Sequence, residues 1–461
     1  MDRPDTDVVV LGAGPAGVAA ATCLLAQGLG VLVIDPALPP APRTESLPTN
    51  GIALAQSLGL GQALAHAGCG RAAAMRLCWR GQPEVRDFAG DGPLLLDRVV
   101  LHDALCGLLP PGVLRRGRVS RLAETAGGVR LRLREASLSA RLVIDARGRA
   151  GLREPGPAAN PLAALTFSGL ADAPAAAPSM LLQSLAEGWL WACLLPGGRL
   201  SGSVFLPAAS LAGRDARGRA GLLARLLAGS DLGALRDLSA GPVAAAALQV
   251  AEDPFASPNV IRTGDAALAR DPIASHGLVH ALRSGAQAAA AAATLLDPQG
   301  EADAARSFIH ERHRWAARSA AEATARAHAE QARHRTAFWE AAVMTPASPP
   351  ASVPWPALSR PLALSPLSRA ALLEGGRIRW EEALWLPRSG QAASRFGQVT
   401  AGRLAQLMAP PAPIAQLSAR LAGEFGPGLA QGILQQLLDE GALVASPATG
   451  AAGQAAAASR A

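Results

Sequence analysis

The sequence predicts an α/β protein with a Rossmann-like domain, an inserted β-sheet domain and a small helical, winged-helix-like C-terminal domain. Three observations predict this class. A glycine-rich turn follows an apolar run near the N-terminus, short alternating strands fill the middle of the chain, and three helix-like segments follow a proline-rich stretch. A chain of 461 residues also exceeds the usual size of one domain.

Changes in composition along the chain place the boundaries. We expect a discontinuous Rossmann-like domain at 1–160 and 250–345, an inserted sheet at 161–249, a proline-rich linker at 346–396, a helical module at 397–446 and a disordered tail at 447–461.

Composition and charge narrow the functional classes. Five scattered cysteines without a CxxC pair favour a reducing compartment over disulfides or zinc. The net charge of +7 suits acidic partners, but no compact basic run is interleaved with aromatics, so we expect no nucleic-acid partner. The acidic N-terminus does not read as a signal peptide, and the apolar segment 286–296 is too short to span a bilayer. A cytoplasmic protein without a membrane partner is predicted.

A dinucleotide-binding motif follows the first apolar run. The turn GAGPAG contains Gly12, Gly14 and Gly17, and the next strand-like run, VLVID, ends in Asp35. Gly12 makes the turn, Gly14 lets the backbone approach a pyrophosphate, and Gly17 lets the helix pack on the strand. Unpaired N–H groups around Ala16 can bind phosphates, and Asp35 can accept ribose hydroxyls. The alternative is a glycine turn with only a packing role.

Further segments resemble the superfamily of flavin-dependent aromatic hydroxylases and tryptophan halogenases. The loop RTESLP, with Arg43 and Glu45, is similar to a loop that lies beside the flavin, although it could be an ordinary surface loop. Arg98 stands at the start of a helix-like segment, where proteins of that superfamily have an arginine near the cofactor. It could equally be a surface charge. Asp145, before a glycine turn in ARLVIDARGRAG, resembles the second motif of the dinucleotide domain.

The segment RTGDAALARDPIASHGLVHALRSG resembles the part of the same superfamily that binds the flavin end of FAD. It implies that Gly264 and Asp265 bind the ribityl chain of FAD, and that the loop from Pro272 to Gly277 lies against the flavin ring. The start of a helix at such a loop can stabilise negative charge on reduced flavin. His276 in this loop and Glu45 are the candidates for catalytic proton handling or substrate orientation, and a structural role is open for both.

The middle of the chain separates hydroxylation from halogenation. Trp189 and Trp191 share one face of a strand, either as core residues or as walls of a cavity. The WxWxIP motif of halogenases is interrupted here, and the chain contains no lysine, whereas halogenases need one. Arg71 stands near that lysine's position, but a guanidinium is a delocalised cation that stays protonated. The resemblance therefore implies an FAD-dependent monooxygenase that uses O2 and a flavin C4a-hydroperoxide, reduced by NAD(P)H or a separate reductase.

No metal is expected. His310 and His313 lie one turn apart in the charged segment 301–342, but they lack a carboxylate at ligand spacing, so this segment is expected to be a solvated helix. Trp315 and Trp339 are expected to anchor this helix to the body.

Within the superfamily the chain looks most similar to the maturation monooxygenases of quinohemoprotein amine dehydrogenase. That resemblance implies hydroxylation of a tryptophan side chain in the small subunit of the dehydrogenase, in biogenesis of a cysteine tryptophylquinone cofactor. The C-terminal module would then dock the polypeptide rather than DNA. A small-molecule aromatic hydroxylase, a halogenase and a non-enzymatic regulator remain as alternatives.

Overall fold

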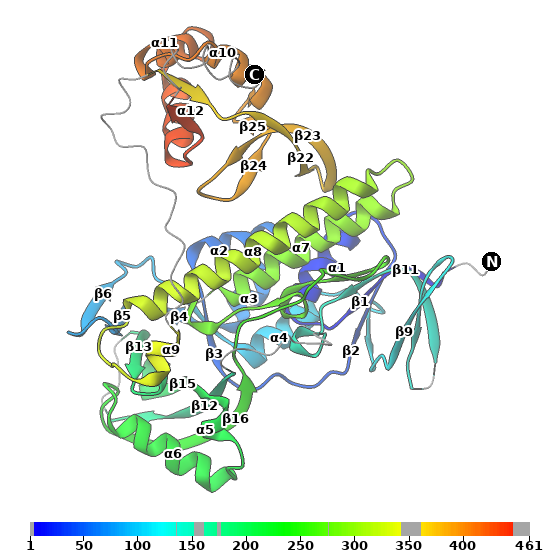
Figure 1. Cartoon of the computed structure of the whole chain (residues 1–461). Coiled ribbons are helices and arrows are strands. Elements are labelled where there is room, and N and C mark those ends of the chain that lie inside the picture. The colour runs from blue at the N-terminus through cyan, green and yellow to red at the C-terminus, as the bar shows by residue number, and fades with distance from the viewer. Residues whose placement is uncertain are drawn as a thin grey trace, which may run out of the picture. The chain divides into compact units, whose positions relative to one another are not determined.

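The computed structural model describes residues 4–134, 136–151, 161–172, 177–274, 276–342 and 361–445 (Figure 1). The chain divides into two compact units, one of Met1–Gln299 with Ile309–Pro346 and one of Gly300–Phe308 with Ala347–Ala461. The expected tail at 447–461 and the first part of the expected linker lie outside the described residues.

A largely parallel sheet carries the glycine turn in the first unit. Its strands, in order, are β18 (Phe255–Ser257), β19 (Val260–Arg262), β11 (Ser137–Asp145), β1 (Thr6–Leu11), β2 (Val31–Asp35) and β8 (Leu114–Arg116). The register places Leu11 of β1 between Ile34 of β2 and Asp145 of β11. The carboxyl ends of these parallel strands therefore meet at one edge, which is where ligands bind in such sheets.

An antiparallel meander extends β11. β9 (Arg121–Thr125) and β10 (Gly128–Arg132) pair across a tight turn at Ala126 and Gly127, and β10 also pairs with β11.

Two alanine-rich helices pack closely in this unit. α1 (Pro15–Ala26) begins with Pro15 after Gly14, which suits the first turn of a helix, and α7 (Gly277–Leu296) begins where a helix start was predicted after the loop from Pro272 to Gly277. A Cβ atom at Gly285 of α7 would lie 2.2 Å from the Ala16 carbonyl oxygen of α1. The small side chains therefore allow the two backbones to approach one another.

A second sheet of seven strands includes the predicted inserted β-sheet domain. Its order is β16 (Leu235–Ala245), β12 (Leu162–Ala171), β15 (Arg199–Pro207), β14 (Gly188–Leu194), β13 (Ser179–Leu185), β5 (Ala74–Cys78) and β6 (Glu84–Asp87). The expected boundaries 161–249 are wrong for this sheet, because β5 and β6 come from the N-terminal segment and β5 pairs in parallel with β13.

The two faces of the second sheet have different neighbours. On one face, Leu190 and Val204 share a buried cluster with Leu223 of α6 (Ala216–Ala228). On the other face, Trp189 and Phe205 share a buried cluster with residues of the loop before α7 and of the C-terminal helices of this unit. The short helix α5 (Ala208–Leu211) follows β15.

Shorter elements connect the two sheets. A three-stranded sheet contains β3 (Thr44–Leu47), β7 (Leu94–Asp97) and β4 (Gly68–Arg71), and a two-stranded one contains β17 (Gln249–Val250) and β20 (Leu268–Ala269). The helices between them are α2 (Thr49–Ser57), α3 (Gly61–Ala67) and α4 (Arg98–Gly107).

The single charged helix expected at 301–342 is interrupted. It forms α8 (Ala302–Glu330) and α9 (Ala337–Ala342), and the side-chain oxygen of Gln331 accepts hydrogen bonds from the backbone N–H groups of Arg333 and His334 in the break. Such side-chain bonds offer the backbone an alternative to continuing the helix.

The second unit has its own core. α10 (Ala401–Met408), α11 (Ile414–Phe425) and α12 (Pro427–Asp439) confirm the three predicted helices, and β27 (Leu443–Ala445) pairs with β21 (Leu362–Leu364). Leu384, Leu404 and Leu437 are among the residues buried in this core.

The linker expected at 346–396 is wrong for its described part. β22 (Leu367–Glu374), β23 (Arg377–Leu386) and β24 (Gln391–Ala393) form a sheet, and β25 (Arg395–Phe396) pairs with β26 (Val399–Thr400). Gly375 and Gly376, both with positive φ, connect β22 and β23. They make a two-residue hairpin turn, which glycine pairs favour.

Candidate active site

The glycine turn has the shape of a phosphate-binding loop. Gly12 has a φ of +100°, and a Cβ atom there would lie 2.6 Å from the Ala146 carbonyl oxygen. A Cβ atom at Gly17 would lie 1.9 Å from the Gly12 carbonyl oxygen, so only glycine lets α1 pack this closely. A Cβ atom at Gly14 would point into open space, and α1 has no side-chain cap. The open space and the uncapped N–H groups at Ala16 could receive a pyrophosphate.

Asp35 lies beside this turn at the end of β2. Its carboxylate accepts hydrogen bonds from the backbone N–H groups of Ala13 (2.8 Å) and Ala37 (2.7 Å). These bonds fix the carboxylate next to the phosphate loop, where it could accept the hydroxyls of a ribose.

Asp145 is engaged by a neighbouring arginine. Its buried carboxylate accepts hydrogen bonds from the Arg147 guanidinium at 2.9 Å and 2.7 Å, and from the Arg147 backbone N–H. This arrangement favours a role in holding the loop after β11 over direct contact with a cofactor.

The GD motif packs against the start of α1. Gly264 has a φ of +57°, its N–H donates to the Ser284 hydroxyl of α7, and a Cβ atom there would lie 2.8 Å from Cβ of Ala16. Burial raises the pKa of the Asp265 carboxyl, and the charges of Arg149 and Arg98 oppose that shift. The motif is thus brought to the phosphate loop, although about 250 residues separate the two in the sequence.

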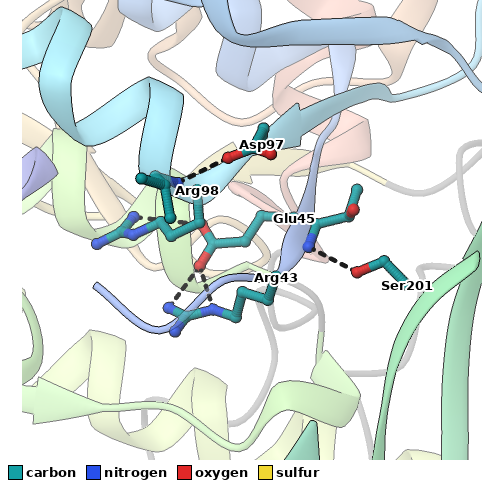
Figure 2. Close-up of polar contacts among 7 residues, drawn as sticks. Arg43, Glu45, Asp97, Arg98 and Ser201 are labelled. Carbon is teal, nitrogen blue, oxygen red and sulfur yellow. Dashed lines mark hydrogen bonds and ion pairs between the residues drawn. The ribbon is translucent and has the colours of Figure 1, made fainter. Parts of the chain in front are cut away.

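Arg43 and Arg98 meet at Glu45 (Figure 2). One carboxylate oxygen of Glu45 lies 2.6 Å from the Arg43 guanidinium, and the other lies 3.3 Å from that of Arg98. The pairing of β3 with β7 places Glu45 opposite Leu96, two residues before Arg98. Asp97 caps α4 by accepting from the backbone N–H groups of Val99 and Val100, which fixes the helix start that carries Arg98.

The charge state of Glu45 follows from these contacts. Burial alone would raise its pKa, but the charges and hydrogen bonds of Arg98 and Arg43 outweigh burial and lower the pKa below its ordinary value. Glu45 therefore stays ionised at neutral pH. The geometry favours orientation of the two arginines over proton transfer by Glu45. Arg98 Nε is buried without a partner among the described residues, so this guanidinium could still bind a ligand.

Asp271 and Arg149 are site residues that the sequence motifs did not single out. Asp271 is 7% exposed, accepts a hydrogen bond from the Ile273 N–H, and has a pKa raised to about 6 by burial. The Arg149 guanidinium donates to the Ala247 carbonyl oxygen and to Gln249, and its charge acts on both Asp265 and Asp271. Arg149 is the second arginine in DARGRAG. Its position just after the end of β11, at the ligand-binding edge of the sheet, is the sequence feature that could have identified it.

The loop before α7 brings the remaining candidates together. Pro272 begins a short 3-10 turn, Gly277 begins α7, and His276 precedes the helix with an exposed side chain. The His276 carbonyl oxygen accepts the His280 N–H, so the main chain of His276 already belongs to the first turn. The role of His276 in proton handling stays a prediction.

The second sheet presents aromatic side chains toward this loop. Trp189 is 1% exposed and stacks on Phe205 with ring centroids 3.7 Å apart, and it shares a buried cluster with Ile273 of the loop. Trp191 is only half-buried at the border of that cluster. The core interpretation therefore fits Trp189 better than Trp191. Arg71 donates to the Gly92 carbonyl oxygen at 2.8 Å, which gives it a local structural contact.

The histidines of α8 correct the prediction of a solvated helix. His328 is buried, and His313 is half-buried with its Nε2 2.7 Å from the Ala251 carbonyl oxygen. Trp339 is buried and donates to the Leu185 carbonyl oxygen, as an anchor should. Within the described ranges, no three His, Cys, Asp or Glu side chains lie where they could hold a metal ion.

The residues present fit FAD. The open space at Gly14 could receive a phosphate, and the fixed carboxylate of Asp35 could accept ribose hydroxyls. The buried Nε of Arg98, which has no partner within the described ranges, could donate to the flavin ring or to the ribityl chain. Among the helices that the structure describes, none is long and apolar enough to cross a membrane.

Comparison with known proteins agrees with this fit. Residues 5–122 match the family described as FAD binding domain, while no curated protein sequence matches the chain. The peptidyl tryptophan dihydroxylase QhpG, described as essential for tryptophylquinone cofactor biogenesis, is 26% identical with a TM-score of 0.74, over 95% of this chain and 99% of QhpG.

Two further solved structures share the fold. The flavin-dependent halogenase CmlS is 18% identical with a TM-score of 0.77, over 97% of each chain. HpxO of Klebsiella pneumoniae, complexed with FAD and uric acid, is 19% identical with a TM-score of 0.57, over 71% of this chain and 89% of HpxO. The chain therefore carries an FAD-binding domain at residues 5–122, and it shares its fold with a tryptophan dihydroxylase and with flavin-dependent halogenases, which are oxidoreductases.

Proposed function

We propose that this protein hydroxylates a tryptophan side chain of a polypeptide, with FAD and O2, in the biogenesis of a tryptophylquinone cofactor of an amine dehydrogenase. The observation that carries the proposal is the similarity to QhpG, which extends over both units of the chain rather than over the FAD-binding unit alone.

The absence of lysine supports hydroxylation over halogenation. CmlS matches the chain over a similar length, so the fold does not separate the two activities. Halogenases of the superfamily that the sequence resembles need a lysine, and none of the 43 basic residues is one. Arginine does not replace it, because its guanidinium stays protonated and delocalises its charge.

The site residues would divide the work as follows. The turn from Gly12 to Gly17 and Asp35 bind the adenosine and diphosphate part of FAD, and Asp265 binds its ribityl chain. Glu45 holds Arg98 in a fixed orientation toward the flavin, and Asp145 holds the loop after β11 through Arg147. Reduced FAD supplies the electrophilic oxygen from O2, and the buried aromatic face of the second sheet excludes water from the reaction. NAD(P)H or a separate reductase provides the electrons.

The second unit would receive the polypeptide. Its α12 contains no basic residue, which argues against use of that helix on DNA. Trp385 of β23 is 47% exposed, as residues that bind another protein often are.

Mass measurement tests the proposal. The FAD-loaded protein is reduced and exposed to O2 with a tryptophan-containing polypeptide from an amine dehydrogenase small subunit, with free aromatic compounds in a parallel reaction. We expect the mass of one or two oxygen atoms on the polypeptide, and the same result with bromide present. Oxygen on free aromatics alone would point to a small-molecule hydroxylase, and a bromine-sized gain would point to a halogenase.

A further inference from the structure

A histidine is buried among aromatic rings on the face of the second sheet that contacts the loop before α7. His328 of α8 is 8% exposed, and its ring centroid lies 5.2 Å from that of Trp339. Both ring nitrogens are buried, and neither has a hydrogen-bond partner in the part of the chain that the structure describes.

Stability does not account for a histidine at this position. A buried polar group without a partner costs about 1–3 kcal/mol. Burial also lowers the pKa of His328, so the imidazole is neutral at pH 7, with one nitrogen that donates and one that accepts. An apolar ring of similar size would fill the same space without this cost.

Two other polar atoms nearby lack partners among the described residues. Thr324 Oγ1 lies one turn before His328 on the same face of α8, and Trp189 Nε1 belongs to the neighbouring strand β14. Trp189 shares its buried cluster with Trp339 and with Ile273 of the loop before α7. Trp189 is thus part of a buried cluster that reaches the loop before α7, and His328 borders the same cluster through its contact with Trp339.

Other polar atoms around the same cluster are satisfied. Trp79 Nε1 donates to the Ala327 carbonyl oxygen at 2.8 Å, and Trp339 Nε1 donates to the Leu185 carbonyl oxygen at 2.8 Å. His334 Nε2 lies 3.2 Å from the Ser184 carbonyl oxygen. The fold thus provides partners for the rings of Trp79, Trp339 and His334. Among the described residues it provides none for the rings of His328 and Trp189.

We propose that His328 is a substrate-specificity residue that accepts a hydrogen bond from the indole N–H of the ring to be hydroxylated, with Thr324 and Trp189 as its polar neighbours. This inference rests on the proposed function and assigns the polar contact of the same substrate site. The surrounding tryptophan and phenylalanine rings supply the stacking surface that a planar indole needs. Phe338, whose centroid lies 6.3 Å from that of His328, is only half-buried, so the cluster reaches the surface beside the histidine.

A binding measurement on the resting, FAD-loaded protein tests the inference without turnover. Indole and 1-methylindole are titrated while the absorbance of the bound flavin is followed, because 1-methylindole keeps the ring but lacks the N–H. We expect the wild-type protein to bind indole at least tenfold more tightly than it binds 1-methylindole. His328→Phe should lose this preference, and His328→Gln, which keeps an acceptor, should retain part of it.

Thermal unfolding of the same proteins separates recognition from structure. His328→Phe should unfold at the wild-type temperature or above it. The matched control His334→Phe should unfold at a lower temperature, because it removes a partnered ring, and should keep the preference for indole. An unchanged preference in His328→Phe, no preference in the wild type, or loss of FAD and stability in His328→Phe would each overturn the inference.

The oxygenation assay keeps the two proposals distinguishable. If the wild type prefers indole but adds no oxygen to the polypeptide, the recognition site stands and the proposed function falls. If the polypeptide gains oxygen equally well in the wild type and in His328→Phe, the proposed function stands and the role of His328 falls.

Discussion

At the scale of single residues, the charges of the site are set by burial and by a few arginines. Glu45 is half-buried between Arg43 and Arg98, so its ionised form is stabilised. Asp271 is buried with one backbone hydrogen bond, so its neutral form is favoured. The pKa values of two carboxyl groups of the first unit are therefore shifted in opposite directions, which is a common property of active sites.

The raised pKa of Asp271 predicts a pH-dependent stability. Its folded-state pKa of about 6 exceeds the ordinary value of 3.8, so ionisation above pH 6 destabilises the folded state, and this cost disappears as the pH falls toward 4. Asp271→Asn keeps an acceptor for the Ile273 N–H but cannot ionise. We expect this variant to gain about 1–2 kcal/mol of unfolding free energy at pH 8 and nothing near pH 4, measured by urea unfolding of the FAD-loaded protein.

Asp87→Asn is the matched control. Asp87 makes the same kind of bond, to the N–H of Ala89 two residues later, but it is exposed. Its replacement should change the stability little at either pH. Equal gains in both variants, or a gain at Asp271 that persists at pH 4, would contradict burial as the cause.

The sequence predicted some of these residues and missed others for physical reasons. Gly12, Gly17 and Asp35 belong to a local motif, so their places follow from a few adjacent residues. His328 could not be placed in this way, because the residues before it on this face of α8 are the buried Ala316 and Ala320 and the half-buried Thr324. Small side chains on an arginine-rich helix give almost no amphipathic signal, and burial there depends on the tertiary contacts.

At the scale of elements, the position of α1 against α7 controls the phosphate loop. Gly285 lies against the Ala16 carbonyl oxygen, and Ala16 belongs to the first turn of α1. The start of α7 after the loop from Pro272 to Gly277 was predicted from the sequence. The reason for a glycine within α7 was not, because that reason is a contact with a segment about 270 residues earlier.

The Gly285→Ala variant tests this contact. A Cβ atom 2.2 Å from a backbone oxygen forces the helices apart, so we expect a loss of about 1–3 kcal/mol in stability and a lower FAD content after purification. Thermal unfolding and the flavin-to-protein absorbance ratio measure both effects. Gly221→Ala in α6 is the control, because its nearest atom is the flexible Arg225 guanidinium at 4.0 Å, and it should stabilise the helix slightly. Normal FAD content in Gly285→Ala would show that α1 can shift freely.

The strands within the expected linker show how a dominant composition can hide a local signal. Proline-rich residues before 361 suggested a spacer through residue 396, yet the pair Gly375–Gly376 between two apolar alternating runs is itself a hairpin signal. The membership of β5 and β6 in the second sheet was missed for a different reason. β5 pairs with β13, about 100 residues later in the chain, and no local pattern predicts such a pairing.

At the scale of the whole molecule, two separate cores suggest a division of labour between FAD chemistry and binding of the polypeptide. The core of the second unit is formed by residues between Leu362 and Leu443, and the motifs matched to FAD all lie in the first unit. A change on the surface of the second unit should therefore affect binding of a large substrate while leaving the flavin site intact.

The Trp385→Ala variant tests this division in the full chain. Trp385 is already 47% exposed, so its truncation should leave the thermal midpoint and the FAD content unchanged. We expect KM for the polypeptide substrate to rise about tenfold, as for an exposed aromatic contact residue, with little change in kcat. Titration of indole in the same variant is the internal control, because a ligand of that size needs only the first unit. Weaker indole binding together with a higher KM would mean that Trp385 acts on the flavin site itself, and an unchanged KM would place the polypeptide elsewhere on the protein.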